Sequence, residues 1–182
     1  MARDVLIIRM TPPWTIRGLR TVDAAQIDAL ATVLMDCVEG GASVSFMLPL
    51  TRERAAEFWR GVAEDVSRGK RVLLVAEDAE GICGTVQLIL SLPENQPHRA
   101  DVAKMLVHRR ARRQGLGEAL MRAAEAAARE KGKTLLVLDT VTGGDGERLY
   151  QRLGWQRVGV IPNYALFPQG GFCATTVFFR EL

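Results

Sequence analysis

The sequence of 182 residues predicts a mixed α/β (α+β) fold, with a largely antiparallel sheet of six to seven strands flanked by about four helices. Two observations favour this fold class. Apolar residues alternate between helical spacing and short strand-like runs in the order β-α-α-β-β-β-α-β-α-β-β. The strands in the middle of the chain are joined by turns rather than by crossover helices, which favours antiparallel pairing. The length fits one domain with a single core.

The N-terminal half is expected to contain one strand and two helices. We expect residues 1–14 to form an N-terminal extension and residues 15–182 to form the single domain, beginning with a strand near 15–21. Asp23 then has the position of a helix N-cap, and Gln26 follows three residues later as in a capping box. Thr51 is expected to cap the second helix in the same way.

Strand patterns dominate the rest of the chain. Strands are expected at residues 71–77, 82–92, 100–107, 134–139, 156–161 and 175–180, and helices at 116–131 and 147–153. The turn Asp78–Gly81 would join the first two of these strands as a hairpin. We therefore expect the helices to pack against one mixed sheet.

Composition and charge exclude several classes of protein. Apolar residues make up 48% of the chain and charged residues 25%, as in an ordinary globular protein. The net charge of +3 is too small to indicate nucleic-acid binding, but it suits an anionic small ligand. No apolar stretch approaches the roughly 20 residues of a membrane span, and no secretory signal is recognisable, so we expect a cytoplasmic location and no membrane partner.

The cysteines indicate neither disulfide bonds nor a metal site. The chain has three of them, Cys37, Cys83 and Cys173. An odd number without metal-ligand spacing predicts no disulfide framework and no bound metal.

The segment Arg112–Gly117 is the most informative part of the chain. It joins the strand expected at 100–107 to the helix that begins at Leu116. A strand, a Gly-rich turn and a helix N-terminus together present free backbone N–H groups and the positive end of the helix dipole. The segment therefore predicts a phosphate-binding site.

Three common classes of phosphate-binding protein do not fit this turn. A P-loop ATPase needs Gly-Lys-Ser/Thr, but Gly117 is followed by Glu118 and Ala119. A dinucleotide-binding fold needs Gly or Ala at the sixth position of its motif, where this chain has Leu120. The basic run at 108–113 lacks the interleaved aromatic residues and the second basic stripe of a nucleic-acid site.

The turn resembles that of the GNAT superfamily of N-acetyltransferases. Arg112, Gly115 and Gly117 match the pattern Arg/Gln-x-x-Gly-x-Gly/Ala, in which successive turn amides bind the pyrophosphate of acetyl-coenzyme A. The segment Leu149–Trp155 resembles the later motif of the family, a helix with a Tyr before a Leu-Gly-aromatic turn. The resemblance covers about residue 15 to the C-terminus and implies the GNAT fold.

The resemblance also implies a coenzyme-binding set. In the family, the backbone at the end of the preceding strand runs alongside the pantetheine arm, and the turn holds the phosphates. The residues so implied are Met105, Leu106, Val107, Arg112, Arg113, Gln114, Gly115, Leu116, Gly117 and Glu118. The family often has an Asn seven residues before the Tyr; Gly143 stands there in this chain, which puts one coenzyme contact in doubt.

Two residues are implied as catalytic. Tyr150 matches the Tyr that faces the coenzyme sulfur and is the candidate general acid, with a structural Tyr packed on the sheet as the alternative. Asp101 lies where many members have an acidic residue that relays a proton, with an ion pair to Arg99 or Lys104 as the alternative. Asp139 is the rival base, and for an α-amino group of pKa about 8 a water chain would suffice.

A closer resemblance, to tabtoxin-resistance acetyltransferases, is carried by residues 40–47, 138–140 and 157–159. It implies transfer of an acetyl group from acetyl-coenzyme A to the amine of an amino-acid-like, antibiotic-like or toxin-like small molecule, by direct attack in a ternary complex. The loop with Phe46, Met47 and Pro49 is expected to border the acceptor. The alternatives are acetylation of protein N-termini or lysines and a non-catalytic coenzyme A-binding module. Exposed terminal strands in this fold often pair, so a homodimer is compatible with it.

Overall fold

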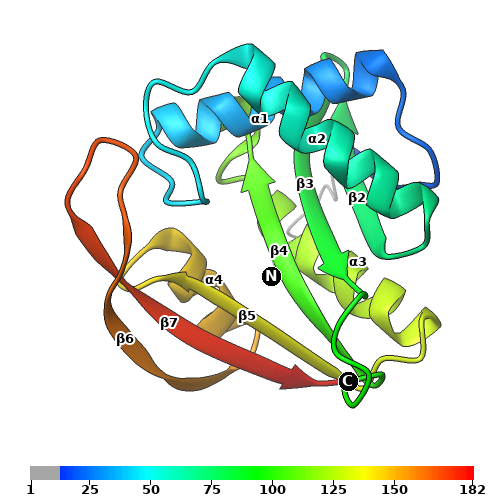
Figure 1. Cartoon of the computed structure of the whole chain (residues 1–182), viewed down its shortest axis with the longest axis vertical. Helices are drawn as coiled ribbons and strands as arrows, with labels where there is room; N and C mark the ends of the chain where they lie inside the picture. Colours follow the sequence, from blue (N-terminus) through cyan, green and yellow to red (C-terminus); the bar gives the residue numbers. More distant parts are fainter. Residues whose placement is uncertain (1–12) are drawn as a thin grey trace, which may run out of the picture.

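A computed structural model describes residues 13–182, which form one seven-stranded sheet and four α-helices (Figure 1). The elements are β1 (Thr15–Leu19), α1 (Ala24–Glu39), α2 (Arg52–Ser67), β2 (Arg71–Asp78), β3 (Gly81–Ile89), β4 (Arg99–Val107), the 3₁₀ helix η1 (Arg109–Ala111), α3 (Leu116–Glu130), β5 (Leu135–Val141), α4 (Asp145–Arg152), β6 (Gln156–Leu166) and β7 (Phe172–Glu181). The predicted fold class and element order are confirmed.

Differences from the expected boundaries are small. The strands β6 and β7 are longer than expected, because they pair along an extended hairpin that continues beyond the apolar runs. Most of the expected N-terminal extension, residues 1–12, lies outside the described residues. Trp14 packs against the core on the α3 side of the sheet.

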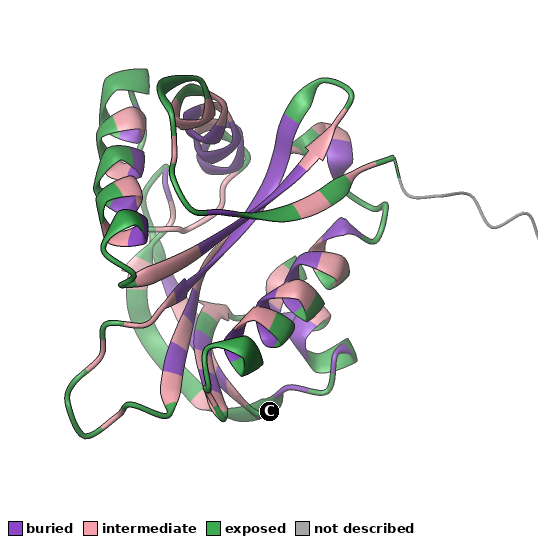
Figure 2. Cartoon of the chain, turned by 90° about the vertical axis from the view of Figure 1, so that its right-hand side faces the viewer, coloured by how far each residue is buried: buried purple, intermediate pink, exposed green. Residues whose placement is uncertain are grey.

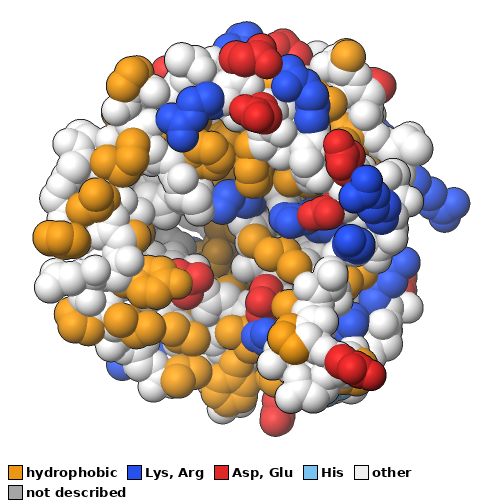
Figure 3. Space-filling view, in the orientation of Figure 1, with side chains coloured by type: hydrophobic (Ala, Val, Ile, Leu, Met, Phe, Trp, Pro, Cys, Tyr) orange, Lys and Arg blue, Asp and Glu red, His pale blue; other side chains and the backbone are white. Residues whose placement is uncertain are grey.

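The strands follow the order β1-β2-β3-β4-β5-β7-β6, and only β4 and β5 run parallel. These two strands pair only where Arg99–Asp101 faces Leu135–Val137. Beyond that point they diverge, so that a wedge opens in the middle of the sheet (Figure 1). The space-filling view from the same side shows a hollow in this region, with charged and apolar side chains around it (Figure 3).

Helices cover both faces of the sheet. Helices α1 and α2 lie on one face and α3 on the other, each with its buried residues turned toward the strands (Figure 2). Leu116, Leu120 and Met121 of α3 belong to one hydrophobic cluster, whereas Leu34 and Trp59 of α1 and α2 belong to the other. Burial of large apolar side chains, at about 1.5–3 kcal/mol each, favours this two-sided arrangement.

The predicted helix caps are present. The Asp23 side chain accepts a hydrogen bond from the Gln26 backbone N–H, and the Gln26 side chain accepts one from the Asp23 N–H, which completes the capping box. Thr51 caps α2 through the Arg54 N–H. In contrast, Gly115 caps α3 without any side-chain hydrogen bond.

Candidate active site

The turn before α3 presents a row of free backbone donors. Gly115 has a left-handed conformation (φ +80°), and the first helical hydrogen bond runs from the Ala119 N–H to the Gly115 carbonyl at 3.1 Å. Within residues 13–182, the backbone N–H groups of residues 113–118 are not used in any hydrogen bond. A Cβ atom on Gly115 would enter open space, so the backbone there can be approached closely by a ligand. This arrangement fits a phosphate group bound at a helix N-terminus.

Gly117 has a different role in the same turn. A Cβ atom at this position would lie 3.2 Å from Leu149 Cδ2 and 3.9 Å from Met105 Sδ. A side chain at this position would therefore be in tight contact with Leu149, which would have to shift by a few tenths of an ångström. The absence of a Cβ atom at Gly117 thus eases packing against α4 as well as access to the backbone.

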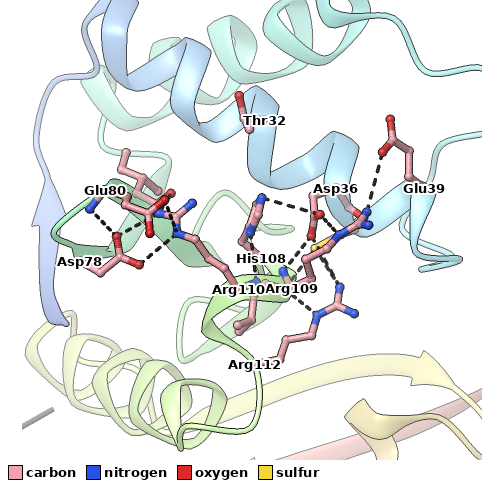
Figure 4. Close-up of polar contacts among 12 residues, drawn as sticks. Thr32, Asp36, Glu39, Asp78, Glu80, His108, Arg109, Arg110 and Arg112 are labelled. Carbon is pink, nitrogen blue, oxygen red and sulfur yellow. Dashed lines mark hydrogen bonds and ion pairs between the residues drawn. The ribbon is translucent and has the colours of Figure 1, made fainter. Parts of the chain in front are cut away.

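The basic residues before the turn form ion pairs that hold it in place (Figure 4). Asp36, which is 8% exposed at the end of α1, accepts hydrogen bonds from the Arg109 backbone N–H at 2.9 Å and from Arg109 Nε. Arg110 is directed away from Asp36: its Nε donates to Asp78 Oδ2 at 3.1 Å and its Nη2 donates to Asp78 Oδ1 at 3.0 Å. These pairs attach the turn to α1 and to the β2–β3 hairpin.

Arg112 and His108 complete the contacts around Asp36. Arg112 Nε donates to the Val107 carbonyl at 3.0 Å, and its Nη2 lies 3.9 Å from Asp36 Oδ2. His108 Nε2 lies 3.6 Å from Asp36 Oδ1. The guanidinium of Arg112 is thus oriented by the protein before any ligand is present.

The other predicted turn residues are placed as follows. Arg113, whose side chain is 86% exposed, lies 3.7 Å from Asp145 at the start of α4. Gln114 Nε2 donates to the Arg110 carbonyl, and Glu118 pairs with Arg122 one turn later in α3. The side chain of Leu116 is buried in the core on the α3 side, so only its backbone can contact a ligand.

The end of β4 forms the wall beside this turn. Met105 and Val107 pack against the core on the α3 side, whereas Leu106 is buried on the opposite face. Because pairing with β5 stops at Asp101, the β4 backbone after that residue has no strand partner on the β5 side. Its edge is free to pair with an extended ligand lying in the wedge.

Tyr150 lies on α4 with its ring in the core. The ring is 6.0 Å from those of Trp155 and Phe178, and the residue is 6% exposed. Burial, and secondarily the charge of Asp139, raise the pKa of the Tyr150 hydroxyl well above its ordinary value. The hydroxyl is protonated at neutral pH, and the raised pKa makes it a weaker acid than an ordinary tyrosine. The ring contacts with Trp155 and Phe178 are also those expected of the alternative, a structural tyrosine packed on the sheet.

Asp101 and Asp139 lie on neighbouring strands. Burial, and to a smaller extent the nearby Asp139, raise the pKa of Asp101, against the opposing effect of Arg99. Arg99 Nη1 lies 2.7 Å from Asp101 Oδ1, so the ion pair considered as the alternative is formed. Asp139 accepts a hydrogen bond from Thr175 Oγ1 at 2.8 Å.

The loop between α1 and α2 closes the hollow from above. Ser43 Oγ donates to the Leu166 carbonyl at 2.7 Å, and the Leu48 N–H donates to the Pro168 carbonyl at 2.9 Å. Phe46 packs edge-on against Phe58 of α2. The expected acceptor wall is thus joined to the β6–β7 hairpin.

Two residues near this site were not identified from the sequence. Asp36 lies among apolar residues of α1, and a buried acid on such a face, near an arginine run, was a usable signal. Lys104 faces the hollow because of a bulge in β4, for which the sequence contains no clear signal. No helix in residues 13–182 has the length and apolar character needed to cross a membrane, and these residues contain no cluster of metal-ligating side chains.

Two sequence comparisons find similarity to acetyltransferases. Residues 69–157 match the family model of the acetyltransferase (GNAT) domain. The chain is similar to an uncharacterized N-acetyltransferase from the hisH-hisA intergenic region of Azospirillum brasilense, with 29% identity over 127 residues, which are 69% of this chain and 74% of that protein. The matched segment 69–157 contains the turn, β4, β5 and α4, which are the elements of the candidate site.

Solved structures show the same fold. An N-acetyltransferase from Staphylococcus aureus Mu50 has a TM-score of 0.76 at 16% identity, covering 92% of this chain and 98% of that one. The structure of yncA from Salmonella typhimurium, solved with its cofactor acetyl-CoA, has a TM-score of 0.75 at 19% identity, covering 93% of this chain and 94% of that one. The fold is therefore the GNAT fold.

Proposed function

We propose that residues 15–182 form an acetyltransferase domain that transfers an acetyl group from acetyl-coenzyme A to the primary amine of a small molecule. The match to the GNAT acetyltransferase domain supports acetyl transfer in general, and the acceptor and mechanism are inferred from the site. The observation that carries the proposal is the row of free N–H groups at residues 113–118, next to the unpaired edge of β4. Together they offer donors for a pyrophosphate and an edge for an extended pantetheine arm.

The coenzyme-binding residues in this proposal are those named from the sequence, and they would contribute in different ways: some by backbone N–H groups, some by side-chain charge and some by the strand edge. Gly115, Leu116, Gly117 and Glu118 would contribute backbone N–H groups, and Arg112 and Arg113 positive charge. Met105, Leu106 and Val107 would contribute the edge of β4, while Gln114 holds the turn through its bond to Arg110.

The chemistry requires removal of one proton and delivery of another. The acceptor nitrogen attacks the thioester carbonyl, the C–S bond breaks, and the amine proton leaves to Asp101 or to water. A Lys-like amine of pKa about 10.4 is only about 10⁻³–10⁻⁴ neutral at pH 7, so a base is useful for it. The raised pKa of Asp101 makes its carboxylate a better proton acceptor. Tyr150 would donate its proton to the departing sulfur.

The resemblance to tabtoxin-resistance enzymes supports an amino-acid-like acceptor. Acetylation of protein N-termini or lysines is the second possibility for the acceptor, and a coenzyme A-binding module without turnover is the second possibility for the protein. A panel of free amino acids, amines and peptides distinguishes small-molecule acceptors from protein acceptors. Tight binding of acetyl-coenzyme A without turnover on that panel would favour the module.

Calorimetric titration tests the cofactor. Acetyl-coenzyme A should bind, ATP and NAD should bind much more weakly, and the Arg112→Glu/Gly115→Asp variant should lose binding while remaining folded. Failure of the folded wild-type protein to bind acetyl-coenzyme A would refute the proposal.

Variants of the two catalytic candidates test the mechanism. Tyr150→Phe should lower kcat by about 10²-fold with little change in acetyl-coenzyme A affinity, since it removes only the donated proton. An unchanged kcat at saturating substrates would exclude this role.

Asp101→Asn should remove the acidic limb of the pH–rate profile, and an intact profile would mean that Asp101 is not the base.

A further inference from the structure

Lys104 is a cation on the α1/α2 face of the sheet without an acidic partner. Its Nζ lies 3.1 Å from Ser45 Oγ and 5.7 Å from the centre of the Phe58 ring. Within residues 13–182 it forms no ion pair. The side chain is half-buried, and removal of an ammonium from water is costly unless an anion compensates for it.

A bulge in β4 places Lys104 on this face. Ala100 and Val102 belong to the core on the α3 side, so Asp101 and Ala103 lie on the opposite face by strand alternation. The register between β3 and β4 shifts between Thr85 and Gln87, and Lys104 has a positive φ of +48°. The bulge therefore interrupts the alternation, and two successive residues of β4 face α1 and α2.

Another cation on this face, Arg71, is already neutralised. Arg71 of β2 lies 3.0 Å from Asp65 Oδ2 and donates to Gln87 Oε1. Gln87 is fully buried, lies opposite Ala103, and its Nε2 has no hydrogen-bond partner within the described residues. An uncompensated ammonium and an unsatisfied amide donor are therefore found on adjacent strands.

The same face carries negative charge closer to the proposed reaction centre. Asp101 is three residues before Lys104 on β4, and Asp139 is on the neighbouring β5. Both lie on the side of the hollow toward β5. The face thus has an acidic end, where Asp101 is paired with Arg99 and lies near Asp139, and a basic end at Lys104.

We propose that Lys104 binds an acid group of the acceptor, so that the acceptor carries a carboxylate in addition to the amine that is acetylated. Lys104 Nζ would pair with the carboxylate while the amine lies toward Asp101 and Asp139. This inference rests on the proposed function. Burial and the positive charge of Arg71 lower the pKa of Lys104 below its ordinary value, and the negative charge of Asp139 opposes them only in part. A bound anion would relieve this unfavourable environment of the ammonium.

Matched acceptors test this proposal. L-amino acids, their carboxamides and the corresponding decarboxylated amines are compared at saturating acetyl-coenzyme A. Because a charge-assisted hydrogen bond is lost in the amide, the wild-type enzyme should prefer the acid by about 10- to 100-fold in kcat/KM. Lys104→Met should remove this preference by lowering activity on acids alone, and Lys104→Arg should retain part of it.

Lys133→Met is the matched control. Lys133 is another half-buried lysine, but its Nζ donates to the Pro97 carbonyl at 2.7 Å, away from the hollow. This variant should keep the wild-type preference. Calorimetric titration of the wild type and every variant with acetyl-coenzyme A separates the two proposals. If the folded wild type does not bind acetyl-coenzyme A, the proposed function itself is refuted.

Three outcomes would overturn the role of Lys104 while acetyl-coenzyme A still binds. Amides could be used as well as acids, or Lys104→Met could keep the preference for acids. The third is that no amino acid is acetylated and none causes NMR shifts at Ser45, Phe58 or Lys104 in the presence of coenzyme A.

Discussion

Replacement of Asp36 by Ala should loosen the turn at residues 112–118, which is proposed to bind phosphate. Asp36 is the buried anchor for residues just before the turn: it accepts from the Arg109 backbone N–H at 2.9 Å and from Arg109 Nε, and His108 and Arg112 lie within 4 Å of it. The substitution leaves these donors without their acceptor, although Asp36 itself is not among the residues proposed to bind the coenzyme.

The magnitude follows from burial. A buried donor such as the Arg109 backbone N–H costs about 1–3 kcal/mol when it is left unsatisfied. The Arg109 side chain is 59% exposed, so its ion pair with Asp36 adds little. We therefore expect a loss of about 2 kcal/mol in the free energy of unfolding. If half of this loss must be made up when acetyl-coenzyme A orders the turn, the Kd rises about fivefold. The kcat at saturation should change little.

Asp28→Ala is the matched control on the same helix. Asp28 pairs with Arg52, and their side chains are 64% and 54% exposed, so its loss should cost no more than about 0.5 kcal/mol and leave the Kd unchanged. Urea denaturation and calorimetric titration of both variants provide the comparison. Equal destabilisation by the two substitutions, or an unchanged Kd in Asp36→Ala, would refute the reasoning.

Three further substitutions test other parts of the structure. Gly146→Ala should lower the free energy of unfolding by about 1–3 kcal/mol, because its Cβ would lie 2.6 Å from Thr140 Oγ1; a wild-type urea curve would contradict this. Gly115→Ala meets no atom within 4 Å, but at φ +80° it should cost about 1 kcal/mol by denaturation, and no cost would mean that the turn adapts freely. The hydrogen bond from Arg110 holds the pKa of Asp78 below its ordinary value, so its stabilisation is present above pH about 4 and is lost as pH falls through the folded-state pKa. Asp78→Asn should therefore destabilise the protein at pH 7 and the difference from wild type should shrink by pH 3, as measured by thermal unfolding; a constant difference would exclude the pair as the cause.

The parts of the fold that could be predicted from the sequence are those fixed by local interactions. The Asp23–Gln26 capping box and the cap at Thr51 depend on atoms only a few residues apart. The lengths of β6 and β7 depend instead on pairing between distant residues, and β6 is exposed along most of its length, so its pattern lacks the apolar alternation that marks a buried strand.

The same distinction separates the two halves of the candidate site. The turn at 112–118 is one continuous segment whose donors are set by a helix N-terminus and by the φ of Gly115, so its residue types are sufficient to predict it. The acceptor face is assembled across β2, β3, β4, β5 and α2. Strict alternation from Ala100 and Val102 would place Lys104 in the core on the α3 side, and only the bulge brings it to the opposite face. If Lys104 binds the acceptor as proposed, acceptor specificity depends on a break in strand register, which is why the sequence indicates the acetyl donor more clearly than the molecule that receives the acetyl group.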